Sequence, residues 1–352
     1  MKVGVAWLTV NRSCNLSCKW CYAQEEANNT KVMSFDLARE LIDILLQAGV
    51  DRYYLIGGEP TLHCDLMRIV QYLMNCNVEI VIVTNGIALS RKDFCQQFTD
   101  LKYKNIHFGI SLKGSTDTDY LENCGVAAFQ KVLLGISNCE KYNLPYSLSY
   151  VLTTDNVDTV DSFAQNLADL KINKYINFQI CNDVILQEDF PSYSSEHPLK
   201  IDKVFAKKYE KIREILDNRI YFHQILPLCQ CDKNLIRIMQ EQNQVSTSCH
   251  VHSRSGVIFD TDGSLLLCNH LAGFSFGKYG VDYWDYASFK EYWDSEYVVG
   301  LHSKLTTMPS IKCQSCELAS KCGGGCCIQW FSKDFQSFEI YNKMHQDKEM
   351  VL

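Results

Sequence analysis

The sequence predicts an α/β protein with a parallel sheet, because six short β-branched runs alternate with helix-length segments along its first half. The runs cover residues 3–10, 53–56, 78–84, 106–111, 147–152 and 175–180. The later helical segments cover about 64–76, 88–99, 125–142 and 157–170. In parallel α/β sheets ligands bind at the carboxyl ends of the strands, so the residues that follow each run are the candidates for function.

The first helix has signals at both of its ends. Ser34 is a residue type that caps a helix, since its oxygen can accept a hydrogen bond from a first-turn amide. Leu37, Leu41 and Leu45 then fall on one face, and Gly49 ends the helix. This segment therefore connects the first two strands.

Composition excludes several classes of protein. The 352 residues include 34 Lys+Arg and 41 Asp+Glu, so the formal net charge is −7, which argues against a basic surface that wraps nucleic acid. No apolar run approaches the ~18 residues of a membrane span. Residues 1–10 lack the cleavage site of a signal peptide. We expect a cytoplasmic protein with neither nucleic acid nor membrane as a partner.

The chain changes character twice. Residues 1–182 hold the strand–helix units, and 183–248 contain polar turns and a charged helix around 200–217, which indicates a helical bridge. Residues 249–352 are punctuated by cysteine and glycine. That composition is typical of a small α+β domain that is held together by metal.

Cysteine is the outlier, with 18 residues in the chain. A long chain without an export signal has little use for disulfides, so metal ligation is the favoured explanation. Cys14, Cys18 and Cys21 form a C-x3-C-x2-C group after the first strand. Three thiolates can hold three irons of a [4Fe-4S] cluster and leave the fourth iron open. Zinc is the alternative, but it normally takes four ligands from paired C-x2-C groups.

With Trp20 before its last cysteine, this group resembles the signature of the radical S-adenosylmethionine (radical SAM) superfamily. The resemblance implies a partial (β/α)6 barrel over residues 1–182, a [4Fe-4S] cluster with an open iron site, and S-adenosyl-L-methionine as cofactor. Gly57, Gly58, Glu59 and Pro60 resemble the family motif that contacts the methionine amino group. Glycines also permit close approach of a backbone to a ligand, and a carboxylate can pair with an ammonium.

Two further strand ends resemble the same family. Asn85, within Thr84-Asn85-Gly86, matches a common element after the third strand. Ser111 and Lys113 lie in a segment whose polar side chains contact the ribose in relatives. The family often has Asp where this chain has Lys113, which leaves Ser111 the better candidate for that contact.

The C-terminal cysteines resemble the SPASM domain, which carries two auxiliary iron–sulfur clusters. The resemblance assigns Cys249, Cys268 and Cys326 to the nearer cluster, and it assigns Cys313, Cys316 and Cys322 to the farther one. Each set lacks a fourth ligand. For the farther cluster the alternatives are His345 and Cys327. For the nearer one they are Cys229, Cys231 or an open iron, and free thiols remain the other interpretation of Cys231 and Cys327.

The hairpin turn at Gly263 is expected to bring strand-end cysteines together. The remaining cysteines are scattered singly and are expected to be small buried apolar residues, namely Cys64, Cys76, Cys95, Cys124, Cys139 and Cys181. Cys181 ends the sixth strand, so a second hypothesis makes it a hydrogen-atom donor to a substrate radical.

The resemblance also implies a reaction. The open iron chelates S-adenosylmethionine, an electron from a flavodoxin- or ferredoxin-type donor cleaves it, and a 5′-deoxyadenosyl radical abstracts hydrogen from the substrate. A peptide is the favoured substrate, through a thioether or carbon–carbon crosslink or an epimerisation, with a separate protein or the bridge binding a leader. The alternatives are residue oxidation of the sulfatase-maturating type and small-molecule dehydrogenation. A non-catalytic iron–sulfur protein is the hypothesis from another class.

Overall fold

The computed structural model describes residues 3–23, 30–100, 105–182, 198–247, 249–272, 274–306 and 310–329. The chain divides into two compact units. The first comprises Met1–Tyr150 and Ser253–Val299, and the second comprises Val151–His252 and Gly300–Leu352. The units group the residues differently from the three predicted domains, whose boundaries at 182 and 248 stay a prediction.

The first unit is built on a mostly parallel sheet in which the strand order is β11-β10-β9-β1-β2-β3-β4-β5. Its strands are β1 (Val5–Asn11), β2 (Arg52–Gly57), β3 (Glu79–Thr84), β4 (Ile106–Leu112), β5 (Tyr146–Leu152), β9 (Gly256–Phe259), β10 (Ser264–Leu266) and β11 (Ser275–Lys278). Strands β1 to β5 pair in parallel and in chain order. The predicted α/β class and parallel sheet are therefore confirmed.

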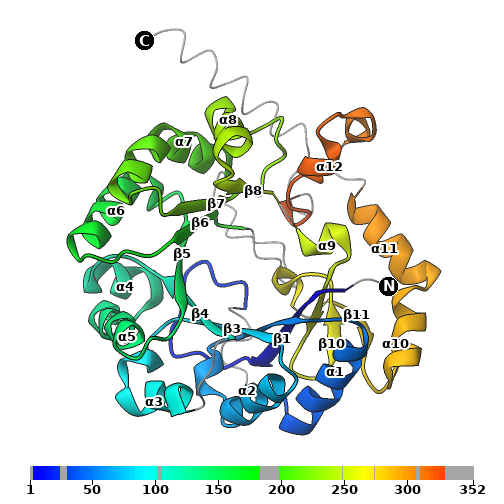
Figure 1. Cartoon of the computed structure of the whole chain (residues 1–352). Helices are drawn as coiled ribbons and strands as arrows, with labels where there is room; N and C mark the ends of the chain where they lie inside the picture. Colours follow the sequence, from blue (N-terminus) through cyan, green and yellow to red (C-terminus); the bar gives the residue numbers. More distant parts are fainter. Residues whose placement is uncertain are drawn as a thin grey trace. The chain divides into compact units, whose positions relative to one another are not determined.

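Helices α1 to α5 lie along the outer side of strands β1 to β5 (Figure 1). They are α1 (Phe35–Gln47), α2 (Leu66–Asn75), α3 (Lys92–Asp100), α4 (Asp117–Cys124) and α5 (Phe129–Lys141). The local signals of α1 are confirmed, since the Leu37 amide donates to the Ser34 side chain at 3.2 Å. Leu41 and Leu45 are fully buried, so α1 contributes its apolar face to the core.

The segment before α5 differs from the prediction. Helix α4 was not predicted, although its Thr116 cap accepts from the Asp119 amide at 3.0 Å. Gly125 ends α4 in the left-handed conformation, with φ of 75°. Helix α5 then begins at Phe129, four residues later than the predicted start at 125. The chain thus uses two helices where one was expected.

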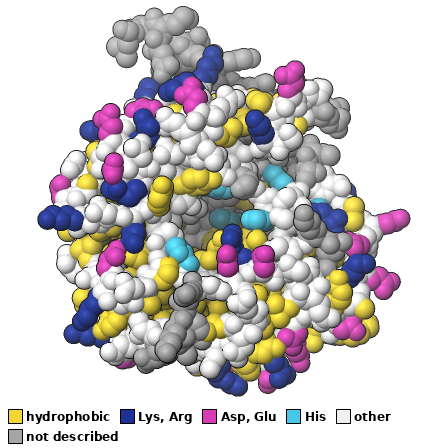
Figure 2. Space-filling model, in the orientation of Figure 1, with side chains coloured by type: hydrophobic (Ala, Val, Ile, Leu, Met, Phe, Trp, Pro, Cys, Tyr) yellow, Lys and Arg dark blue, Asp and Glu magenta, His cyan; other side chains and the backbone are white. Residues whose placement is uncertain are grey.

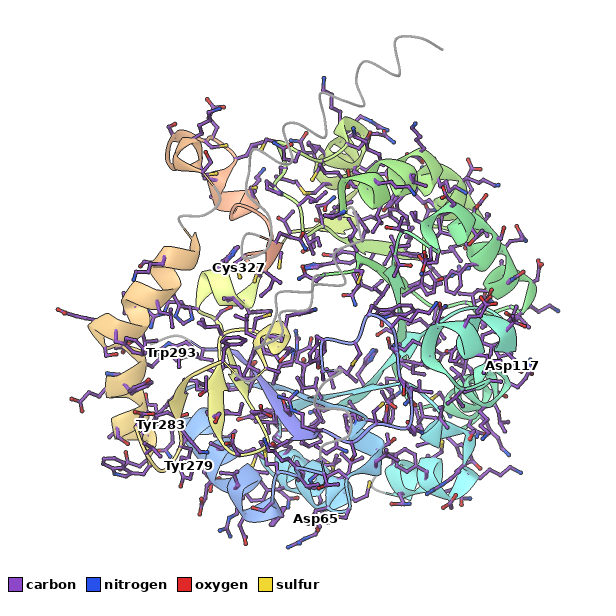
Figure 3. The ribbon with its side chains drawn as sticks, turned by 180° about the vertical axis from the view of Figure 1, so that it is seen from behind. Asp65, Asp117, Tyr279, Tyr283, Trp293 and Cys327 are labelled. Atoms are coloured by element: carbon purple, nitrogen blue, oxygen red, sulfur yellow. The ribbon has the colours of Figure 1, made fainter. Side chains whose placement is uncertain are left out.

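Residues 253–299 pack in the first unit because β9 extends its sheet. Strand β9 pairs in parallel with β1, with Trp7 opposite Ile258. The predicted hairpin at Gly263 is confirmed, since β9 and β10 are antiparallel neighbours. Helix α10 (Tyr286–Trp293) follows, and Tyr283 and Trp293 are both labelled in Figure 3. The ring centroids of Tyr283 and Phe289 are 5.0 Å apart, so aromatic packing stabilises this segment.

The second unit contains the sixth predicted strand, β6 (Ile176–Ile180), and pairs it in parallel with β7 (Ile220–His223), which pairs with β8 (Val245–Ser246). Its helices are α6 (Val160–Asp169), α7 (Pro198–Ile215), α8 (Lys233–Gln242), α9 (His250–Ser253) and α12 (Ala319–Cys322). Helix α7 is the charged helix predicted around 200–217. Its Phe205 ring lies 4.6 Å from that of Phe222 on β7 and 5.3 Å from that of Phe178 on β6.

The described surface bears charges of both signs. Figure 2 shows basic and acidic side chains interspersed over one face, without a continuous basic patch on it. Among the residues that the structure describes, none of the helices has the length and apolar character that a bilayer crossing requires.

Candidate functional site

Three thiols share the loop that follows β1. Cys14 interacts electrostatically with Cys18 and Cys21, and burial raises the pKa of the Cys14 thiol to about 11. The Leu16 amide donates to the Cys14 sulfur at 3.4 Å. This is the kind of N–H···S contact that stabilises a metal-bound thiolate.

The end of α4 supports this cysteine loop. The amide of Ser17 donates to the carbonyl of Cys124, and that of Lys19 to the carbonyl of Asn123, both at 3.0 Å. Asn123 in turn donates through its side chain to the Lys113 carbonyl at 2.7 Å. The unpredicted helix therefore fixes the loop that carries the predicted cluster ligands.

Cys124 has a role that the sequence analysis missed. It is buried, as expected, and its thiol donates to the Tyr120 carbonyl at 2.9 Å, while its sulfur contacts that of Cys18. This contact is the main reason why the pKa of Cys18 is lowered to about 6, and it raises the pKa of Cys124 itself. The expectation of burial was wrong for Cys64, which is exposed, and for Cys76, which is half-buried, because both flank the amphipathic helix α2 outside its core face.

The glycine pair brings the end of β2 against the cysteine loop. The Gly58 amide donates to the Asn11 carbonyl at 2.9 Å. A Cβ at Gly58 would lie 2.3 Å from the carbonyl oxygens of Arg12 and Ser13, and one at Gly57 would lie 2.2 Å from that of Asn11. The close approach that the glycines allow is thus to the chain's own backbone, at the residues that lead into Cys14.

Glu59 is almost completely buried, and its carboxylate accepts several hydrogen bonds. One oxygen accepts from the hydroxyls of Thr84, at 2.6 Å, and Thr61, at 2.7 Å, and from the Thr61 amide at 3.2 Å. The other accepts from the Asn85 amide at 2.7 Å. Burial raises the pKa of Glu59, while these donors act against that shift. Pro60 follows as the first residue of a short 3-10 turn, Pro60–Leu62, and is itself buried.

Two polar residues from neighbouring strand ends reach toward the cysteine loop. The Asn85 side chain donates to the Asn15 side chain at 2.7 Å. Lys113 is buried, and its ammonium donates to the Ser111 hydroxyl at 2.7 Å. Burial raises the pKa of Cys21, and the positive charge of Lys113 acts against that shift and helps to lower the pKa of Cys18. A cation thus stands where the family often has Asp.

The C-terminal hairpin meets the same loop within the first unit. Arg12 forms a two-pronged ion pair with Asp260, with nitrogen–oxygen distances of 2.6 and 3.0 Å. Burial raises the pKa of Tyr22, and Cys21 and Cys268 add to the shift. The rings of Tyr22 and His270 lie 5.1 Å apart. Cys268 is therefore placed near the N-terminal thiols, and Trp20 is buried beside them in sequence.

The second unit brings Cys249 and Cys326 close enough to interact electrostatically. The pKa of Cys326 is lowered to about 7, mainly by a hydrogen bond from Cys327 and also by one from Asn182, whose amide nitrogen lies 3.0 Å from the sulfur. Cys327, which is buried and labelled in Figure 3, thus acts here as a hydrogen-bond donor to a candidate ligand.

The second unit also contains Cys229, Cys231 and Cys181 among the predicted site residues. Cys229 and Cys231 lie near Cys322, and their assignment to the nearer cluster stays a prediction. Cys181 is buried, and its amide donates to the Leu152 carbonyl at 2.8 Å. The predicted ligand His345 lies outside the described residues.

Within the ranges that the structure describes, no three Cys, His, Asp or Glu side chains converge tightly enough to hold a metal ion. The donor set nevertheless fits an iron–sulfur cluster. Cys14, Cys18 and Cys21 share one loop, and the Leu16 amide and the Lys113 ammonium both favour their thiolate forms.

Comparison with known proteins defines the class. Residues 8–167 match the family model described as the Radical SAM superfamily. This part of the chain is therefore a radical SAM domain, as the cysteine loop predicts.

Relatives with known names match only part of the chain. A probable GTP 3′,8-cyclase from Sulfurisphaera tokodaii is 29% identical over 217 residues, which are 60% of this chain and 63% of that protein. An Fe-coproporphyrin III synthase from Methanosarcina barkeri is 29% identical over 170 residues, 48% of this chain and 41% of that protein. The chain thus spans less than two thirds of the length of each.

Solved structures match nearly the whole chain. anSMEcpe with bound AdoMet and the Cp18Cys peptide has a TM-score of 0.67 and 18% identity, covering 93% of this chain and 89% of that one. Streptococcus suis SuiB bound to S-adenosylmethionine has a TM-score of 0.67 and 17% identity, covering 94% and 75%. At these identities the likeness establishes the fold.

Proposed function

We propose that this chain is a radical S-adenosylmethionine enzyme that modifies a peptide, by forming a thioether or carbon–carbon crosslink or by epimerising a residue. The observation that carries the proposal is the loop of Cys14, Cys18 and Cys21 in a radical SAM domain, beside the buried Lys113. The peptide as substrate is supported by the shared fold, since the solved structures of anSMEcpe and SuiB are described with bound peptides.

The N-terminal site has parts with distinct tasks. Cys14, Cys18 and Cys21 would hold a [4Fe-4S] cluster that, with S-adenosylmethionine, supplies radical chemistry when bound. The buried Glu59 carboxylate offers a fixed acceptor for the methionine ammonium, because its donors hold both oxygens in place. Ser111 is the candidate ribose contact, and Lys113 orients its hydroxyl by donating to it.

The remaining partners follow from the same proposal. The C-terminal cysteines would hold two auxiliary clusters, which accept an electron from the substrate or bind its thiolate. A flavodoxin- or ferredoxin-type donor would supply the first electron, and a separate protein would bind a leader peptide. The setting of such chemistry would be the cytoplasm.

The relatives that are named GTP 3′,8-cyclase favour a second candidate, a small-molecule substrate. Anaerobic reconstitution, reduction with dithionite and detection of 5′-deoxyadenosine test radical chemistry for both candidates. The matched control is the chain with Cys14, Cys18 and Cys21 replaced by Ala, which should form none. If the intact, reconstituted chain also forms none, the proposal is wrong.

The substrate is tested in the same assay. The Cp18Cys peptide and GTP are added separately, and each is examined by mass spectrometry. A peptide that loses two mass units in a crosslink supports the proposal, because crosslinking removes two hydrogen atoms. A peptide that gains one deuterium in D₂O also supports it, because epimerisation replaces a hydrogen without any other change in mass. Conversion of GTP with an unchanged peptide would favour the second candidate.

A further inference from the structure

The exposed Cys229 follows β7 in a loop over residues 224–232 and lies near two cysteines from the far end of the chain. Its thiol lies close enough to Cys322 and Cys313 to interact with them electrostatically. These two cysteines belong to the set for which His345 and Cys327 are the other candidates for the fourth ligand.

Backbone contacts place this loop against the segment of Cys322 independently of the thiols. The Leu228 amide donates to the Cys322 sulfur at 3.3 Å, and the Cys326 amide donates to the Ile225 carbonyl at 2.7 Å. Gly325 has a φ of 79°, and a Cβ there would lie 2.7 Å from the Ile225 oxygen. The two segments therefore touch along their backbones, and a glycine is required where they meet.

A buried carboxylate holds the loop in this position. Asp202 on α7 accepts from the Asp232 amide at 2.8 Å and from the Gln224 side chain at 2.5 Å. The Gln224 side-chain oxygen accepts in turn from the Leu226 amide at 2.9 Å. The loop is thus fixed at both of its ends, and these hydrogen bonds determine the position of Cys229.

Cys231, two residues on, is held differently. Its thiol is directed at the carbonyl oxygens of Pro227, at 3.3 Å, and Leu226, at 3.7 Å, inside the same loop. A thiol that donates to its own loop is a structural residue, and this difference makes Cys231 a matched comparison for Cys229.

We infer that Cys229 is the fourth thiolate of a metal site that also uses Cys313, Cys316 and Cys322. The Cys316 amide donates to the Cys313 carbonyl at 3.2 Å, which gives this C-x2-C pair the tight turn that metal-binding knuckles use. Four thiolates close a [4Fe-4S] cluster. Cys229 and Cys316 are both exposed, so packing does not prevent their side chains from rotating toward the metal.

The inference rests on the proposed auxiliary clusters but not on cleavage of S-adenosylmethionine. It is therefore tested in a chain in which Cys14, Cys18 and Cys21 are replaced by Ala, which removes the N-terminal cluster. After anaerobic reconstitution, iron, zinc and sulfide are counted per chain, and the clusters are identified by Mössbauer spectroscopy. Cys229→Ser, Cys231→Ser and Cys64→Ser are compared in this background, with circular dichroism to confirm folding.

Cys229→Ser should lose about four irons per chain or convert one cluster to a three-iron form, whereas Cys231→Ser and Cys64→Ser should keep the parent count. Full retention of a four-iron cluster in Cys229→Ser would overturn the inference. So would equal losses in Cys229→Ser and Cys231→Ser, or a parent chain that binds no C-terminal cluster. Failure of the proposed radical chemistry would instead appear in the 5′-deoxyadenosine assay of the intact chain and leave these counts unchanged.

Discussion

The thiol of Cys124 at the end of α4 contacts the sulfur of Cys18 in the cysteine loop and favours the thiolate form of Cys18. Hydrogen bonds to ligand sulfurs raise the reduction potential of an iron–sulfur cluster, because they stabilise the more negative reduced state. We predict that Cys124→Ala lowers the midpoint potential of the N-terminal cluster. A bond of about 1 kcal/mol corresponds to on the order of 40 mV for one electron.

Potentiometric titration followed by electron paramagnetic resonance measures this shift. Cys124→Ser keeps a donor and should recover most of the parent potential. Cys95→Ala is the control, since Cys95 is buried and its thiol is directed at the Leu89 carbonyl. Equal shifts in the Ala and Ser variants of Cys124 would show that the residue acts through packing alone.

The contact between Cys124 and Cys18 could not be predicted from the sequence, whereas several local features could. The Ser34 cap and the Gly263 hairpin were predictable, because each depends on residues a few positions apart. Helix α4 has a local signal too, in Thr116 followed three residues later by Asp119. The contact between Cys18 and Cys124 has no such signal, because it arises only when α4 packs on the loop.

In the second unit, too, a contact between residues far apart in the sequence could not be predicted. The resemblance to the SPASM domain implies that Cys313, Cys316 and Cys322 form one ligand set, within which the C-x2-C pair is local. It did not assign Cys229 to them, since the loop after β7 meets the segment of Cys322 only in the folded chain. Cysteine spacing thus predicts which thiols share a loop, and packing decides which loops share a metal.

Gly58→Ala should destabilise the first unit and disturb the cysteine loop. Its Cβ would meet the carbonyl oxygens of Arg12 and Ser13 at 2.3 Å, and backbone at that distance must move. Overpacking of this kind costs about 1–3 kcal/mol or more. We expect a lower thermal unfolding midpoint and less iron bound at the N-terminal cysteines.

Gly300→Ala is the matched control for Gly58. Gly300 lies in α11 (Glu296–Thr306), and a Cβ there meets nothing within 4 Å. Alanine is favoured over glycine by about 1 kcal/mol in a helix, so this variant should be as stable as the parent or more so. A Gly58→Ala chain that melts with the parent would contradict the packing described here.

The ion pair of Arg12 and Asp260 should be required for docking of the C-terminal hairpin on the loop after β1. Arg12 is almost fully buried, so removing its partner leaves a charge without compensation. Asp260→Asn is expected to cost about 3–5 kcal/mol. Arg12→Met should cost less, because Asp260 is partly exposed and also accepts from the Thr261 amide at 2.6 Å.

Denaturant unfolding of the two single variants and the double variant measures the coupling. We expect the double variant to lose less stability than the two single variants together, since it leaves neither Arg12 nor Asp260 as a charge without its partner. Additive losses would mean that the two side chains do not stabilise each other.

The buried Asp202 should make the stability of the second unit fall as pH rises. Burial raises the pKa of Asp202 to about 7, so the folded chain keeps a proton that the unfolded chain has released above about pH 4. Stability is therefore greatest below the unfolded pKa, decreases from about pH 4 to about pH 7, and then levels off. Asp202→Asn should remove this decrease from the thermal midpoint measured against pH.

Asp161 provides a control of opposite sign in the same unit. Lys208 and Lys211 each donate to its carboxylate at 2.7 Å, and they hold the pKa of Asp161 well below its usual value. The contribution of Asp161 to stability is fully present above the pKa of Asp in the unfolded chain. It is lost as the pH falls through the pKa of Asp161 in the folded chain. Asp161→Asn should therefore leave the slope between pH 5 and pH 7 unchanged at about the parent value. If Asp161→Asn alters that slope and Asp202→Asn does not, the assignment of the slope to the carboxylate beneath the Cys229 loop is wrong.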